Sequence, residues 1–366
     1  MAAVRRETPD MVPVCPRGVQ PLRQIYGGEW PSQAHMIVAS RELDFDCALT
    51  WSPGENYAPG VRIVEADGRA DDGTPLRTTL LETPSGNLMR TGYKTGPMVG
   101  GAHMSSLTSA VPGAGMVTCE HDVEILDVVY RRTEPEDVRE FVEIEREMGS
   151  DGVVQGEVAN PLNMAVRDVG LENLMLMYFD DPAFARRILA VYQNVALWQE
   201  EALLNAGATI IYSDGVWCTT DLWSRPQIDD LIAPLIREQT ALAHQAGAYF
   251  HLFMDGNCMA ALESIAEMGV DILSPLETPP SGDTNVAEAK RRIGDRVCLW
   301  GGVNAYWDVM RGPREHVREA VIAAISAGAP GGGYVLSTAD SVYEPCPLEN
   351  VKEFLRAGRE EGSYQT

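Results

Sequence analysis

From about residue 120 onward, short apolar runs alternate with longer amphipathic segments. The runs predict short buried strands, and the amphipathic segments predict helices. Repeated strand–helix units of this kind favour a parallel barrel. We therefore predict an α/β fold, a (β/α)8 TIM-type barrel, with strands in six segments: 153–157, 209–214, 249–255, 271–277, 297–304 and 333–340.

Capping residues predict where several helices begin. Asp181 is the expected N-cap of a long helix, and Ser224 is the expected start of another. Thr133 and Glu136 have the spacing of a capping box ahead of a third helix. Shorter helices are predicted at 258–268, 285–293, 314–327 and 348–360.

The first 115 residues have a different pattern. Between 60 and 95, β-prone runs are separated by Asp-Gly and Pro-Ser-Gly turns, which predicts a β-hairpin excursion. The segment 95–119 has no acidic or basic side chain other than one histidine, and it contains five glycines, so we expect a mobile loop. The predicted division is an N-terminal segment, 1–115, with a β-ribbon and a glycine-rich loop packed on the barrel, and the barrel itself, 116–366.

Charge narrows the classes of partner. The chain has 53 Asp and Glu against 29 Lys and Arg, a net charge of −24. Such a field repels nucleic-acid phosphates and anionic membrane surfaces, so we expect neither partner. The first residues lack the apolar run of a secretory signal, which favours a cytoplasmic location. The seven scattered cysteines argue against a disulfide framework.

Polar residues stand at the end of each predicted strand, where a parallel barrel places its active site. They are Glu157, Asp214, Asp255, Glu277, Asn304 and Asp340. Strand alternation puts His251 and Phe253 on the same face as Asp255, and Tyr212 with Asp214. This grouping predicts catalytic roles for Asp214, His251 and Asp255. The alternative is that His251 is a core histidine and the carboxylates cap helices.

The same ring of side chains is a candidate metal site. His251, Asp255 and Glu277 supply nitrogen and oxygen donors, and Cys258 follows three residues after Asp255. The helix that begins at Cys258 would lower the pKa of its thiol and favour a thiolate ligand. Packing of Cys258 inside that helix is an equal alternative.

Three phrases then carry a family resemblance: GVDILSPLE, AKRRIGDRVCLWGGVNAYWDVMRGPREHV and GGYVLSTADSVYEPCPLENVKEF. In their order and spacing they resemble the uroporphyrinogen decarboxylase superfamily over about residues 120–360. The resemblance implies a (β/α)8 barrel and either of two activities, decarboxylation of a porphyrinogen or methyl transfer that involves corrinoid proteins. The hairpin sequence LETPSGNLMRTG is similar to a ribbon of the methyltransferase branch.

The resemblance also distinguishes between branches. Decarboxylases have an arginine-rich element near the N-terminus, where this chain keeps only Arg17 and Arg23 in a loose arrangement. Coenzyme M methyltransferases of the superfamily hold zinc with a His-x-Cys pair and a later Cys. Those positions correspond here to Phe253, Asp255 and the neighbourhood of Asp340, so the thiol-activating zinc site is not retained.

The resemblance therefore implies a methyltransferase that acts on the donor side. We expect it to move a methyl group from a small methoxylated aromatic compound to a corrinoid, either free or carried by a partner corrinoid protein. Zinc is the expected metal, and a homodimer is a further expectation. A porphyrinogen-type decarboxylase and a non-catalytic barrel of the same superfamily remain alternatives. The expected donor-binding residues are Glu157, Tyr212, Trp217, Phe253, Glu277, Asn304 and Asp340, with Trp300 as a further aromatic wall.

Overall fold

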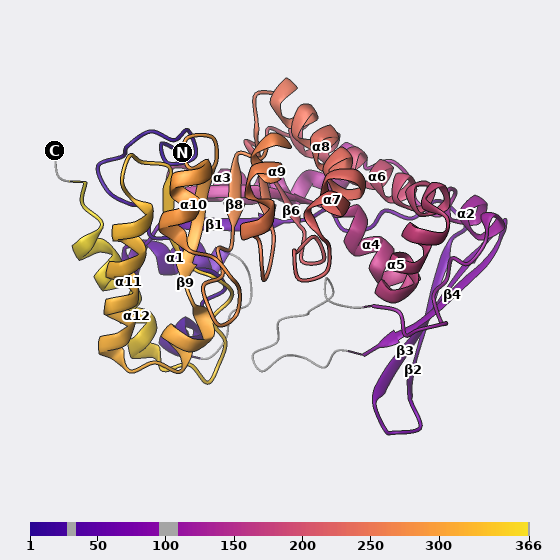
Figure 1. Ribbon diagram of the computed structural model, residues 1–366, viewed down its shortest axis with the longest axis horizontal. Helices are drawn as coiled ribbons and strands as arrows, with labels where there is room; N and C mark the ends of the chain where they lie inside the picture. Colours follow the sequence, from indigo (N-terminus) through magenta and orange to yellow (C-terminus); the bar gives the residue numbers. More distant parts are fainter. Residues whose placement is uncertain (28–33, 95–108, 365–366) are drawn as a thin grey trace.

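The computed structural model describes residues 1–27, 34–94 and 109–364. Seven parallel strands form its main sheet in the order β1-β5-β6-β7-β8-β9-β10 (Figure 1). Most of their residues are buried, as expected for parallel strands covered by helices. The bounds are β1 (Cys47–Trp51), β5 (Gly152–Val158), β6 (Ile210–Asp214), β7 (Tyr249–Phe253), β8 (Ile272–Ser274), β9 (Cys298–Val303) and β10 (Tyr334–Thr338).

An extended N-terminal segment joins the two ends of this sheet. Val14 forms a parallel bridge with Leu336 in β10, and the backbone N–H of Cys15 donates to the Leu336 carbonyl at 2.9 Å. On its other side, the Val14 carbonyl accepts from the N–H of Asp46, just before β1, at 2.8 Å. Residues 13–15 thus occupy the place of an eighth strand. The sheet therefore differs from a regular (β/α)8 barrel, and it also includes β1 from the segment 1–115.

Helices surround the sheet, with α10 to α12 on one side of Figure 1 and α4 to α6 on the other. Among the described residues, no helix combines the length and apolarity needed to cross a bilayer. The α-helices are α1 (Ala34–Leu43), α2 (Glu120–Leu126), α3 (Arg139–Met148), α4 (Pro161–Val169), α5 (Leu171–Asp180), α6 (Pro182–Asn205), α7 (Arg225–Gln227), α8 (Ala233–Gln245), α9 (Leu262–Glu267), α10 (Val286–Ile293), α11 (Arg314–Gly328) and α12 (Leu348–Glu361). The shorter or wider helical turns are η1 (Gln20–Tyr26), η3 (Pro135–Val138), η4 (Ile228–Ile232), η5 (Met259–Ala261) and η6 (Ala305–Met310).

Two of the three predicted helix starts are confirmed. The Asp181 carboxylate accepts from the N–H of Phe184 at 3.1 Å and caps α6. Ser224 forms a capping box with Gln227 ahead of α7. The third was wrong by one residue, because Glu134 pairs with Asp137 where Thr133 and Glu136 were expected. Pro135 is the reason: a proline is favoured at the first helical position, so the cap is the residue before it.

The segment expected to form a β-ribbon is a three-stranded antiparallel sheet, with β2 (Arg62–Arg69), β3 (Pro75–Thr83) and β4 (Gly86–Tyr93) in that order. In Figure 1 this ribbon extends away from the barrel. Its strand β4 packs against α2 and α4, and Leu81 of β3 belongs to the main hydrophobic core. Most of the predicted glycine-rich loop, residues 95–108, lies outside the described residues.

A buried ion network attaches the ribbon to α4. The Asp168 carboxylate, only 1% exposed, accepts from the Arg167 guanidinium at 2.7 Å and from the Tyr192 hydroxyl at 2.8 Å. Arg90 of β4 forms an ion pair with the same carboxylate at 3.0 Å. Burial raises the pKa of Asp168, but the two arginines more than offset this and hold it below its usual value. Asp168 is therefore an ionised anchor for two cations.

We expect Asp168→Asn to destabilise the protein by about 3–5 kcal/mol, because it leaves buried guanidinium charge without its counterion. Urea unfolding measures this difference. Glu201→Gln is the matched control, since Glu201 pairs with Arg132 where both side chains are largely exposed. Its expected cost is below about 1 kcal/mol. Equal costs for the two variants would contradict the role of the Asp168 network.

Candidate active site

An arginine lies at the centre of the polar side chains that the strand ends bring together. Nη1 of Arg17 donates to the Tyr212 hydroxyl at 2.9 Å, and Nε lies 3.7 Å from the Asp340 carboxylate. The guanidinium carbon lies 4.0 Å from the centre of the Phe253 ring, within cation–π range. Arg17 follows the segment 13–15, and its backbone N–H donates to the Thr338 hydroxyl at the end of β10. Closure of the sheet thus positions this cation.

His251 lies deeper, among aromatic rings. It is 2% exposed, its ring stacks on Trp300 at 5.3 Å, and it meets the edge of Tyr212 at 5.0 Å. Nδ1 lies 2.6 Å from Oε1 of Gln155, and Nε2 lies 2.7 Å from the Ser274 hydroxyl. Burial, together with the charge of Arg17, lowers the pKa of His251 to about 3. The ring is therefore neutral, with both nitrogens hydrogen-bonded.

Asp255 and Glu277 form a coupled pair of acids. Burial and the neighbouring Asp340 carboxylate raise the pKa of Asp255. Burial and the charge of Asp255 raise the pKa of Glu277 to about 8. The N–H of Gly256 donates to Oε2 of Glu277 at 2.9 Å and fixes that side chain. Two carboxylates this close hold a proton between them near neutral pH.

A second pair of acids stands at the ends of β5 and β6. Burial raises the pKa of Glu157 to about 7, with a further contribution from Asp214 and an opposing one from Arg17. Asp214 is held through its backbone, because the side-chain amide of Asn163 donates to its carbonyl at 2.6 Å. Asn163 itself is placed by α4, whose N-cap is Asn160. Glu157 is thus a carboxyl group that both gains and loses a proton close to pH 7.

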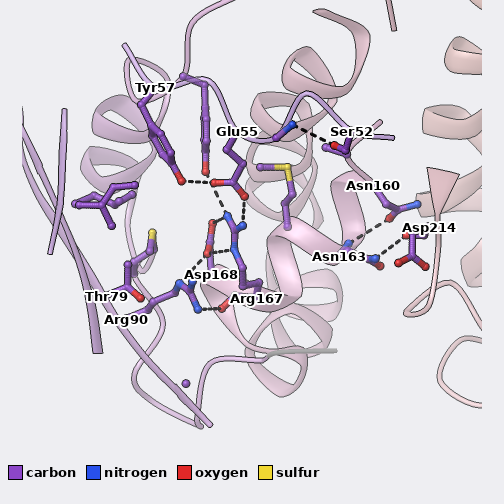
Figure 2. A pocket seen from close by; sticks show the side chains of 18 of the residues that line it. Ser52, Glu55, Tyr57, Thr79, Arg90, Asn160, Asn163, Arg167, Asp168 and Asp214 are labelled. Atoms are coloured by element: carbon purple, nitrogen blue, oxygen red, sulfur yellow. Dashed lines mark hydrogen bonds and ion pairs between the residues drawn. The ribbon is translucent and has the colours of Figure 1, made fainter. Parts of the chain in front are cut away.

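Two cavities open at this face. The ribbon cavity, of about 730 Å³, lies between the β2–β4 ribbon and the barrel, and its lining includes Glu157, Asp214, Arg90 and Arg167 (Figure 2). The rim cavity, of about 650 Å³, is lined by loops that follow β8, β9 and β10, and its lining includes Glu277, Asn304, Tyr306, Asp340 and Tyr343. Five of the six predicted strand-end residues are thus shared between two cavities, and Asp255 is in the lining of neither.

The other predicted residues have varied positions. Half-buried Trp217 packs against Tyr212 and Phe253, so three of the expected aromatic residues do gather. Asn304 is committed to structure: its carbonyl oxygen accepts from the N–H groups of Tyr306 and Trp307, and its amide donates to Ser281 at 3.0 Å. The two hydrogen bonds from Tyr306 and Trp307 make Asn304 the N-cap of η6.

Cys258 corrects one expectation. Its thiol is buried and lies 3.4 Å from the Thr284 hydroxyl. Burial raises the pKa of this thiol to about 12, the reverse of the lowered pKa that the sequence suggested. The reason is that η5, which starts there, is only three residues long, and desolvation outweighs any effect of its N-terminus. The alternative, a packed core cysteine, agrees with the structure.

The side chains proposed for zinc do not fit a metal. Among the residues that the structure describes, no group of three or more His, Cys, Asp or Glu side chains could hold one. Both His251 nitrogens already have partners, and the Cys258 thiol is protonated.

The cysteines give a direct check on this arrangement. Of the seven, only Cys119 is exposed. We expect one fast-reacting thiol per native chain with Ellman's reagent at pH 8, and its loss in Cys119→Ser. Cys258→Ser should leave the fast phase intact. A fast phase that disappears in Cys258→Ser would show that this thiol is reactive after all.

Sequence reasoning missed the central role of Arg17, along with Gln155 and Ser274 as partners of His251. Arg17 was noted only as a remnant of an arginine-rich element. Its place depends on pairing between the N-terminal segment and β10, at opposite ends of the chain. No local pattern around Arg17 reveals that pairing.

Comparison with known proteins agrees with this barrel. The profile of the family described as Uroporphyrinogen decarboxylase (URO-D) matches residues 111–361, more than half of the chain. The protein belongs to the uroporphyrinogen decarboxylase family. The resemblance stated from the sequence is thereby confirmed.

Relatives within this family have two kinds of name. The methylcobamide:CoM methyltransferase MtaA of Methanosarcina barkeri is 25% identical over 370 residues, which cover 98% of this chain and 95% of the relative. A uroporphyrinogen decarboxylase of Shigella dysenteriae serotype 1 is 25% identical over 259 residues, covering 66% and 68%. Among solved structures, a methyltransferase from Methanosarcina mazei has a TM-score of 0.64 at 19% identity and covers 98% of this chain and 97% of its own. The last comparison supports the fold alone.

Proposed function

We propose that this protein transfers a methyl group from a small methoxylated aromatic compound to a reduced corrinoid, either free or carried by a partner protein in the cytoplasm. The observation that carries the proposal is the position of Arg17 between carboxyl groups, one of which, Glu157, has a pKa of about 7. The match along nearly the whole length of a methylcobamide:CoM methyltransferase supports the reaction class.

The chemistry needs a better leaving group, because an aryl ether oxygen departs poorly as an anion. Protonated Glu157 can supply the proton, as a general acid whose pKa lies near the working pH. The methyl group moves to the nucleophilic cobalt(I) of the acceptor, which provides the electron pair for the new bond. The electrons of the broken C–O bond stay with the oxygen, which takes the proton from Glu157 and leaves as a phenol. Arg17, whose charge acts on Glu157, can stabilise negative charge that develops on that oxygen.

The aromatic side chains suit such a donor. Tyr212, Phe253 and Trp217 form one cluster at the mouth of the barrel. Tyr212 and Phe253 are each only 2% exposed, so this cluster meets a ligand mainly through half-buried Trp217. Tyr57 and Tyr93 line the ribbon cavity with partly exposed rings that can pack against a methoxylated ring. His251, neutral and fixed by Gln155 and Ser274, supports Tyr212 from below and takes no proton in this scheme.

The charge of the site weighs against the decarboxylase alternative. Glu157, Asp214, Asp255 and Asp340 all act on Arg17, which already pairs with Asp340. Arg90 and Arg167 of the ribbon cavity are likewise already paired, with Asp168. A porphyrinogen brings several carboxylates, and each one buried without a cation costs on the order of several kcal/mol. A neutral ether carries no such cost.

The test is an anaerobic assay of the purified protein with guaiacol and cobalamin reduced to cobalt(I). We expect catechol and methylated cobalamin in equal amounts, and no catechol when the corrinoid is omitted. Uroporphyrinogen is incubated in parallel. Release of carbon dioxide from it without a corrinoid would establish the decarboxylase, and inactivity in both assays over a panel of methoxylated phenols would favour a non-catalytic barrel.

A further inference from the structure

The two cavities lie on opposite sides of the barrel mouth. In the order of strands around the ring, with residues 13–15 between β10 and β1, the pair β5 and β6 stands four places from the pair β9 and β10. Glu157 and Asp214, from the first pair, line the ribbon cavity. Asn304 and Asp340, which follow the second pair, line the rim cavity.

Arg17 stands between these cavities. Its guanidinium reaches Tyr212 of β6 with one nitrogen and approaches Asp340 beyond β10 with another, and it covers the Phe253 ring of β7. It therefore spans the mouth from one side to the other. The acids also divide around it, with Glu157 and Asp214 towards the ribbon and Glu277 and Asp340 towards the rim.

Each described cation that lines the ribbon cavity is paired with a carboxylate. Figure 2 shows a chain of contacts in which Glu55 accepts from Arg167, and Arg167 and Arg90 both pair with Asp168. The Tyr57 hydroxyl donates to Glu55 as well. Arg77 and Lys94 also line the cavity, and they pair with Glu65 and Asp67. Each of these four cations therefore already has a carboxylate partner before an anionic ligand arrives.

The rim cavity has a different character. Tyr306, which lines it, and its neighbour Trp307 are 43% and 48% exposed, and their rings meet edge to face at 5.0 Å. Met310, Tyr343 and Pro345 add further apolar surface. The rim cavity therefore offers aromatic surface against which a large, flat, conjugated acceptor can pack.

We propose that Arg17 divides the barrel mouth into two binding sites: the ribbon cavity takes the methyl donor and accepts only uncharged methyl ethers, and the acceptor approaches through the rim cavity. The inference rests on the proposed methyl transfer. An in-line displacement needs the leaving group and the nucleophile on opposite sides of the transferred carbon, and the two cavities provide that arrangement. Glu157, the acid that protonates the leaving oxygen, lies on the donor side.

The location of the donor is tested by calorimetric titration with guaiacol, without corrinoid. Ala159→Phe fills the ribbon cavity from its barrel wall, and Ser52→Trp narrows it from an exposed position that tolerates a large side chain. We expect each to weaken guaiacol binding at least about tenfold. Met310→Trp, the matched change in the rim cavity, should leave it within about twofold. The reverse order of effects would overturn the assignment.

The charge selection has its own test. Vanillate differs from guaiacol by one carboxylate, and we expect it to bind at least about tenfold more weakly. Glu55→Gln removes one negative charge from the paired network, and the 23% exposure of that side chain makes the change tolerable to folding. The affinity for vanillate relative to that for guaiacol should then rise at least about fivefold. An unchanged preference would refute selection by the paired charges.

These measurements separate the inference from the proposed function. If the protein binds guaiacol in the ribbon cavity but transfers no methyl group, the binding-site assignment is supported and the proposed function is contradicted. If the protein demethylates guaiacol but binds it equally well after Ala159→Phe and Ser52→Trp, the proposed function is supported and the binding-site assignment is contradicted.

Discussion

Glu157→Gln should lower the rate of guaiacol demethylation by about 10²–10³-fold, the range in which a well-placed general acid contributes. The amide keeps the size of the side chain and can donate a hydrogen bond, but it has no proton to transfer. Glu157 lines the donor cavity, and its pKa of about 7 allows it to donate near neutral pH. The turnover number at saturating donor and cobalt(I) corrinoid is the quantity to measure.

The pH dependence follows from the same group. The active form carries the proton, so the rate should fall as pH rises through about 7. The protonated fraction drops from about nine-tenths at pH 6 to about one-tenth at pH 8. Glu157→Gln should remove this falling limb of the pH–rate profile and leave a low rate that does not change between pH 6 and 8.

Glu277→Gln is the matched control, with the same chemical change on the opposite side of Arg17. Its pKa of about 8 and its place in the rim cavity make it the alternative acid. We expect it to cost less than tenfold and to keep the limb near pH 7. If the two variants exchange these behaviours, the donor enters from the rim and Glu277 is the acid. A Glu157→Gln rate within about threefold of the parent would contradict acid catalysis by Glu157.

Local patterning predicted most of the barrel. The six expected strands correspond to β5 through β10, because each is an apolar run that packs between helices and neighbouring strands. The same reasoning missed β1 and the segment 13–15. Their place in the sheet comes from pairing with distant strands, as between Val14 and Leu336, and a periodicity of two or of 3.6 holds no information about that partner.

The candidate site, like the fold, was predicted from the sequence only in part. The rule that strand ends carry function identified Glu157, Asp214, Asp255, Glu277 and Asp340. Burial raises the pKa of Glu157, Asp255 and Glu277, and the charges of Asp214 and Asp340 add to this effect. Strand alternation gives the face of a side chain and not its depth. His251 has the expected proximity to Tyr212, yet it lies where Gln155 and Ser274 can satisfy both nitrogens. Its catalytic and metal-binding roles therefore lose their chemical basis, while the roles expected of the carboxylates remain proposals.

Arg17→Leu should lower the turnover number about 100-fold or more, a loss of about 2.7 kcal/mol in transition-state stabilisation. The leucine keeps apolar contact with Phe253 but cannot donate to Tyr212 or stabilise charge on a leaving oxygen. Arg17→Lys keeps the charge and loses the planar fork that serves Tyr212 and Asp340 together, so an intermediate rate is expected. Thermal unfolding of the three proteins checks that they are equally folded.

The position of the pH limb distinguishes an electrostatic role of Arg17 from a purely structural one. Its positive charge lowers the pKa of Glu157, in opposition to burial and Asp214, which raise it. Removal of the charge must therefore move the pKa of Glu157 upward, and the falling limb of the Arg17→Leu rate should shift to higher pH. Arg17→Lys should keep the limb near pH 7, because the charge remains. A limb at the same pH in all three proteins would mean that Arg17 only packs the mouth of the barrel, since a structural defect lowers the rate without a change in the charge that faces Glu157.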